Sequence, residues 1–195
     1  ATKPVEVVNA KPTDWPMYRR DAARGSAATV EVPDALKKQW STKIGGRLTQ
    51  PIVVGETVFV AETDSHTVHA LAADGGKQLW QFTAGGRIDS SPTYFRACIY
   101  FGCADGWVYC VDAADGRLAW RFRAAPAERL VCVEGQLESI WPVHGSVIVQ
   151  NDTLYVTAGR SSFLDGGIVL YRINPHTGEE LSKTVLHHLD PETGK

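Results

Sequence analysis

Eight residues of the sequence have side chains that could bind an anionic ligand or a partner. Arginine guanidinium groups bind carboxylates through paired hydrogen bonds, and an indole ring offers a flat stacking surface. The residues concerned are Arg47, Arg87, Asp89, Glu138, Trp141, His144, Arg160 and Asp165. The alternative is structural: Arg47 and Arg87 are then solvated loop residues, and Trp141 with Pro142 forms a packed corner. Whether these residues lie close together depends on the fold.

Other reactive side chains do not form a familiar catalytic or metal-binding pattern. The phosphate-loop, Gly-x-Ser-x-Gly and HExxH motifs are absent from the sequence. His66 and His69 are an odd number of residues apart, so one strand would point them to opposite faces. We therefore predict no catalytic residue and no metal site in this chain.

The four cysteines, Cys98, Cys103, Cys110 and Cys132, include no CxxC pair. We expect them to be small buried hydrophobic residues. Cys103 and Cys110 are predicted to share a sheet face across a hairpin. Cys132 is the alternative disulfide partner of Cys103. The sequence leaves the disulfide state open.

Charge and hydropathy exclude two classes of partner. The chain has 20 basic and 22 acidic residues among 195, a balance that disfavours nucleic acid as a ligand. Its longest apolar runs, such as 167–171, are far shorter than the roughly 20 residues that span a bilayer. We expect neither nucleic-acid binding nor a membrane span.

An internal repeat of 40 residues organises the sequence. Trp40, Trp80 and Trp120 mark its period, and the stretches 45–84 and 85–124 align along their whole length. A third, more diverged copy follows, in which Ser182 takes the tryptophan position.

Each copy contains four short segments rich in Val, Ile, Tyr, Phe and Thr between Gly, Asp and Asn turns. The pattern predicts strands near 50–54, 57–62, 67–72 and 78–84, then near 91–95, 98–103, 107–112 and 118–123. The Asp105-Gly106 pair predicts a tight hairpin between two of them. Four antiparallel strands per repeat of this length indicate an all-β fold, a β-propeller of four-stranded blades.

The turn before each tryptophan resembles the docking signature D-x-x-T-G-K/E-x-x-W of the pyrroloquinoline-quinone (PQQ)-type propeller family. Copy one departs from it at Ala72 and Gly75, and copy two at Asp115. Glycine allows the positive φ of the turn, an Asp or Asn side chain bonds the turn backbone, and tryptophan fills the gap between blades. The predicted blade-docking residues are Trp40, Trp80, Asp112, Gly116, Trp120, Asn174 and Gly178.

We divide the chain into a lead-in, 1–35, and a partial propeller, 36–195. Residues 14–24 resemble the lead-in of bacterial PQQ-like propellers. The propeller begins with an outer strand, 36–44, continues with blades 45–84, 85–124 and 125–189, and starts a further turn at 190–195. About three and a quarter blades do not close a ring, and the resemblance implies a parent with eight. We expect an apolar sheet face at each open end and the remaining blades in a missing C-terminal part, with a nicked chain or paired copies as lesser possibilities.

Strand connections alternate between the two ends of such sheets, so the inter-blade loops and both insertions, 124–144 and 159–167, should emerge on one face. That face would carry the eight candidate residues. The resemblance implies that quinone and substrate sites are built there, with arginines clamping quinone carboxylates and Trp141 offering a stacking surface.

We expect a non-catalytic scaffold that presents this face to a protein, a domain or a ligand, without a cofactor. The resembled family includes such members, among them an outer-membrane assembly lipoprotein, which implies an exported, periplasmic or extracellular location. The alternative is part of a PQQ- and Ca²⁺-dependent quinoprotein dehydrogenase that oxidises alcohols or sugars. A third possibility is chemistry supplied by a fused domain.

Overall fold

Three four-stranded antiparallel sheets make up most of the protein. The computed structural model describes residues 9–188. The first sheet contains β1 (Ile52–Val54), β2 (Thr57–Glu62), β3 (Thr67–Ala72) and β4 (Gln78–Thr83). The second contains β5 (Thr93–Phe95), β6 (Cys98–Gly102), β7 (Trp107–Asp112) and β8 (Leu118–Arg123). The third contains β11 (Ile148–Gln150), β12 (Thr153–Ala158), β13 (Ile168–Ile173) and β14 (Glu180–Leu186).

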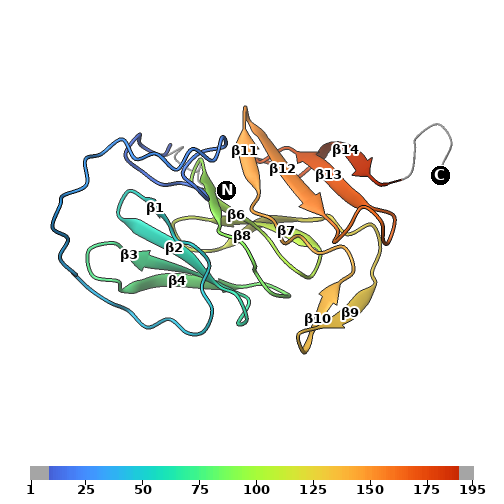
Figure 1. The fold of residues 1–195 in the computed structure, drawn as a ribbon, viewed down its shortest axis with the longest axis horizontal. Helices are drawn as coiled ribbons and strands as arrows, with labels where there is room; N and C mark the ends of the chain where they lie inside the picture. The colour runs from blue at the N-terminus through green and yellow to red at the C-terminus, as the bar shows by residue number, and fades with distance from the viewer. Residues whose placement is uncertain (1–8, 189–195) are drawn as a thin grey trace, which may run out of the picture.

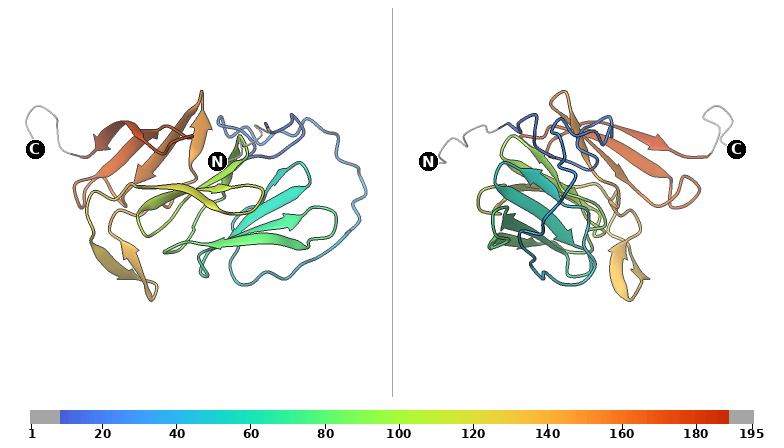
Figure 2. Two further views of the ribbon diagram at one scale, coloured as in Figure 1. Left: turned by 180° about the vertical axis from the view of Figure 1, so that it is seen from behind. Right: turned by 60° about the vertical axis from the view of Figure 1, so that its left-hand side comes forward.

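The sheets stand in a row that does not close into a ring (Figures 1 and 2). Within each sheet the strands follow chain order, and each strand pairs antiparallel with the next one in the sequence. The expected all-β fold of four-stranded antiparallel blades is confirmed, and so is the open row. No helix in residues 9–188 is long and apolar enough to cross a membrane.

Two apolar clusters hold the row together, one on each side of the second sheet. Ile99 and Phe101 point toward the first sheet, whereas Tyr100 and Val108 point toward the third. All four side chains are 0–1% exposed. Alternation along β6 therefore gives the second sheet two buried faces.

Tryptophan side chains connect each sheet to the next. The indole nitrogen of Trp80 donates to the carbonyl oxygen of Ala113 at 2.9 Å, and that of Trp120 donates to Pro175 at 3.0 Å. Trp40 makes the equivalent bond to Ala73 at 2.8 Å. Glycines of the three turns, Gly76, Gly116 and Gly178, have φ of 69°, 74° and 75° and lie directly against these rings.

Side chains of the same turns bond to the turn backbone. Asp112 accepts a hydrogen bond from the amide of Ala114 at 2.8 Å, and Asn174 accepts one from His176 at 2.9 Å. These contacts stabilise the turn that receives the tryptophan.

The lead-in runs beside the first strands of the sheets. Trp15 pairs with Val53 of β1, and the amide of Tyr94 in β5 donates to Pro16 at 2.7 Å. Arg24 reaches the carbonyl oxygen of Ser146, just before β11, at 3.3 Å. One short segment therefore contacts all three sheets.

The structure differs from the sequence-based expectations in three places. Residues 36–44 form no strand, because no partner strand lies beside them among the described residues. Cys103 and Cys110 lie on opposite faces of the second sheet, since Tyr100, not Phe101, pairs with Cys110. The outer face of the third sheet is mixed rather than apolar, with exposed Arg172 and Ser182 paired on it. The predicted turn at 190–195 and the end of the third blade lie outside the described residues.

The insertion between the second and third sheets forms an additional hairpin of β9 (Leu130–Val133) and β10 (Gln136–Ser139). Its two-residue turn, Glu134-Gly135, has positive φ at both positions, 50° and 79°, as type I′ hairpin turns require. The hairpin projects from the end of the sheets (Figure 1).

Candidate functional site

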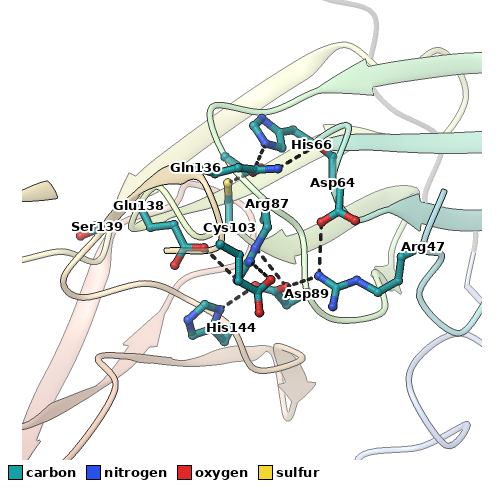
Figure 3. A network of polar contacts seen from close by, with 12 residues as sticks. Arg47, Asp64, His66, Arg87, Asp89, Cys103, Gln136, Glu138, Ser139 and His144 are labelled. Carbon is teal, nitrogen blue, oxygen red and sulfur yellow. Dashed lines mark hydrogen bonds and ion pairs between the residues drawn. The ribbon is translucent and has the colours of Figure 1, made fainter. Parts of the chain in front are cut away.

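Loops from all three sheets meet at one end of the row and form a network of charged residues (Figure 3). The contributing segments are the loop before β1, the β2–β3 turn, the β4–β5 loop, the β9–β10 hairpin and the two loops that flank β11 and β12. We call this set of contacts the loop-end network. It contains six of the eight candidate residues: Arg47, Arg87, Asp89, Glu138, His144 and Arg160.

Glu138 is the buried centre of the network. Its side chain is 0% exposed, and its Oε1 lies 2.8 Å from Nη2 of Arg87. Its other oxygen, Oε2, accepts a hydrogen bond from Arg160. A carboxylate removed from water needs such compensation, so two guanidinium groups from different loops surround it.

Arg87 connects three carboxylates. Besides Glu138, its Nη1 donates to Glu134 at 2.6 Å, and its Nε lies 3.5 Å from Asp89. The Arg87 side chain is only 7% exposed, whereas Glu134 is 65% exposed. Arg87 therefore links the β4–β5 loop to the turn of the hairpin and to β10 rather than facing solvent.

Asp89 continues the network toward the third and first sheets. Nδ1 of His144 lies 2.6 Å from its Oδ2, and Arg47 lies 3.8 Å from its Oδ1. Burial raises the pKa of Asp89, but the bond to His144 and the surrounding positive charges outweigh it and hold that pKa below 3.8. Asp89 is therefore held as a carboxylate.

Four further residues of the network were not among the sequence-based candidates. His66 bonds Gln136 at 2.7 Å, Gln136 donates to the carbonyl oxygen of Asp64 at 3.4 Å, and Arg47 pairs with Asp64 at 3.3 Å. Glu134 is the fourth. In the sequence, the one signal that could have identified these residues was their position at the same end as the insertions. Gln136 and Glu134 meet their partners only once the hairpin forms.

Trp141 and Asp165 meet each other beside the network. The indole nitrogen of Trp141 donates to the backbone oxygen of Asp165 at 2.8 Å, and the ring is 7% exposed. Arg129 lies over the ring, 5.8 Å from its centroid. The expected open stacking surface is thus a packed corner in this structure.

Two of the arginines considered for a quinone clamp already have a partner within the protein. Arg87 and Arg160 both direct their guanidinium groups at buried Glu138, so neither is available to an added carboxylate. In residues 9–188, no three His, Cys, Asp or Glu side chains converge as a metal site would require. What the loop-end network can do is hold loops and hairpin in one fixed arrangement.

The cysteines lie away from the network or at its margin, and all four are free thiols. Cys98 and Cys110 are diagonal neighbours on the face of the second sheet that carries Tyr100. The hydrogen bond from Cys110 lowers the pKa of Cys98 to about 7 against the effect of burial, and Tyr100 acts in the same direction.

Comparison with known proteins identifies the repeat. Residues 26–195 match the sequence profile of a PQQ-type family described as outer membrane protein assembly factor BamB. The chain is 26% identical over 102 residues to BamB of Salmonella typhimurium, which covers 44% of this chain and 26% of that protein. It is 32% identical over 101 residues to BamB of Burkholderia pseudomallei, covering 51% of this chain and 26% of that protein. The match thus spans about a quarter of the length of these relatives.

A solved structure shares the fold. Quinohemoprotein alcohol dehydrogenase ADHIIG of Pseudomonas putida HK5 superimposes with a TM-score of 0.77 at 18% identity, over 93% of this chain and 28% of that one. The repeat, the tryptophan turns and the matched profile agree, and the chain belongs to the PQQ-type β-propeller family.

Proposed function

We propose that this chain is part of a non-catalytic propeller scaffold that presents its loop end to a protein partner. The observation that carries the proposal is the internal pairing of the loop-end network. Arg87 and Arg160 both pair with Glu138, which is fully buried. Charges used in this way fix the shape of a surface and are not free to activate a substrate.

The relatives support the same reading. Proteins named as outer membrane assembly factors match this chain at 26% and 32% identity, although over about a quarter of their length. We therefore place the protein in the bacterial envelope, on the periplasmic side, without a cofactor. Additional blades of the parent propeller complete the ring in this proposal.

The second candidate is a quinoprotein dehydrogenase, favoured by the fold it shares with ADHIIG. A shared fold at 18% sequence identity does not establish a shared activity. In that case PQQ and Ca²⁺ would supply the redox chemistry, and they would need binding residues other than Arg87 and Arg160.

A titration of the full-length protein with PQQ and Ca²⁺, followed by absorbance and calorimetry, separates the two candidates. We expect no saturable binding. Stoichiometric binding that is lost in Arg47→Ala would overturn the scaffold proposal, because Arg47 is the most exposed arginine of the network, at 55%. Arg117→Ala is the matched control, since Arg117 is 87% exposed and lies at the tryptophan-turn end of the second sheet.

A further inference from the structure

The two faces of the β9–β10 hairpin differ in character. Val131 pairs with Glu138 and Val133 with Gln136, so this face carries the residues of the loop-end network. Leu130, Cys132 and Leu137 lie on the other face. Leu130 and Leu137 are 57% and 65% exposed, so the network fixes one face and leaves an apolar face open.

Only one edge of the hairpin is attached to the rest of the protein. The amide of Ser139 in β10 donates to the carbonyl oxygen of Ala104 at 2.8 Å. The amide of Ile140 donates to the carbonyl oxygen of Arg129. Every second residue of an antiparallel strand directs its amide and carbonyl groups to the same neighbour, so those of residues 129, 131 and 133 face β10. The amide and carbonyl groups of Leu130 and Cys132 therefore point away, and no described residue bonds to them. β9 is an open strand edge.

A cavity of about 400 Å³ adjoins the open apolar face. Leu130, Leu137 and Trp107 provide apolar surface, and Arg123 and Arg129 provide positive charge. Arg121 lies over the Trp107 ring, 4.4 Å from its centroid, and adds a third cation nearby. The volume lies within the range of known ligand pockets.

The acidic residues of the cavity do not cancel this charge. Asp105 is occupied by the hydroxyl of Tyr109 and by the amide of Trp107 at 3.0 Å. Glu128 is the other acidic lining residue, and among the described residues it has no ion-pair partner. Arg129 is already paired with Asp165 at 4.0 Å, whereas Arg121 and Arg123 have no ion-pair partner among the described residues. Two such arginines against one uncommitted carboxylate favour an anionic group on the ligand.

We propose that β9 receives an extended peptide segment of a partner protein as an added strand. The peptide backbone pairs with the outward groups of Leu130 and Cys132. An apolar side chain enters the cavity between Leu130 and Leu137, and an acidic side chain two residues away in the peptide meets Arg123 or Arg129. Strand addition uses main-chain bonds for affinity and alternate side chains for specificity, which is what this edge and cavity offer together. The inference rests on the proposed scaffold function and specifies its partner.

Selection from a phage-displayed library of random dodecapeptides on the full-length protein tests the proposal. We expect enriched sequences in which an apolar and an acidic residue are two positions apart, on the same face of the strand. A synthetic peptide from that pool should bind about tenfold more weakly to Arg123→Glu and to Arg129→Glu in fluorescence anisotropy. Arg117→Glu should bind it like the wild type, because Arg117 lies at the other end of the sheet.

A second readout examines the strand pairing itself. Two versions of the same peptide carry N-methyl groups at alternate residues, one at the odd and one at the even positions, so each lacks the hydrogen-bond donors of one strand edge. We expect only the version methylated on the edge that faces β9 to lose binding. Equal binding of both N-methylated peptides, or selection of peptides that bind the Arg123→Glu variant as well as the wild type, would overturn the proposal.

Failure here is distinguishable from failure of the proposed function. If no peptide is enriched and PQQ does not bind, the peptide site is wrong and the scaffold proposal stands. If PQQ binds stoichiometrically, the scaffold proposal is wrong whatever the peptide selection gives.

Discussion

At the scale of single residues, Glu138 is the most constrained side chain of the loop end. It is fully buried and lies between Arg87 and Arg160. Glu138→Gln removes the negative charge while keeping the shape. Arg160 then loses its carboxylate partner, and Arg87 loses the most buried of its three. We expect the free energy of unfolding to fall by about 3 kcal/mol, measured by urea denaturation.

Glu134→Gln is the matched control for this prediction. Glu134 contacts the same Arg87 but is 65% exposed, so solvent already screens the pair. We expect a change of less than about 1 kcal/mol. Equal effects of the two substitutions would contradict the view that burial at Glu138 organises the loop end.

Asp89 gives the loop end a dependence on pH. Its pKa in the folded protein is held below 3.8, so ionised Asp89 stabilises the fold above that pH. This contribution disappears as the pH falls through the lowered pKa. The urea midpoints of wild type and Asp89→Asn should therefore differ at neutral pH and converge as the pH falls through the lowered pKa. A gap that persists in acid would show that the carboxylate charge is not responsible.

At the scale of elements, the tryptophan turns join the sheets. Three glycines of the first sheet differ in whether an added Cβ would meet a neighbouring side chain and in whether φ is positive. A Cβ on Gly76 would lie 2.6 Å from the Trp40 ring, and φ there is 69°. Gly55 has a φ of 56° with nothing within 4 Å, and Gly75 has neither constraint.

Alanine substitutions of these glycines should form a graded series. We expect Gly75→Ala to change stability by less than about 0.5 kcal/mol, Gly55→Ala to cost about 1 kcal/mol from backbone strain, and Gly76→Ala to cost more than about 2 kcal/mol. Thermal unfolding measures all three. Similar values for Gly55→Ala and Gly76→Ala would mean that contact with Trp40 adds nothing.

The same elements show how far the sequence could predict the structure. Alternating apolar residues and the turn glycines predicted the strands of the first two sheets closely, because both signals are local. The hairpin at 130–139 was missed, since Leu130–Val133 has no alternation of its own to distinguish it from a loop. Cys103 was assigned to the wrong face because a one-residue difference in register reverses every side chain. The two partners of Glu138 come from two separate segments, the β4–β5 and β12–β13 loops, and depend on tertiary structure.

At the scale of the whole molecule, the second sheet differs from its neighbours because it is covered on both faces. The third sheet is covered on one face only, and every residue of β14 is exposed. On its outer face, Arg172 and Ser182 pair at the position where the second sheet has Cys110 and Trp120. The row therefore does not end in a copy of its internal, tryptophan-lined interface.

This difference predicts a gradient of stability along the row, as expected when each unit contacts only its neighbours. Hydrogen exchange followed by mass spectrometry should show the slowest deuterium uptake in β6 and β7 and the fastest in β9 and β14, because local opening there exposes little buried surface. Uniform uptake across the three sheets would instead indicate one cooperative unit. Uptake in β14 that slows as the protein is concentrated would show that a second copy covers the mixed outer face of the third sheet, where Leu170 and Leu186 lie beside Arg172 and Ser182.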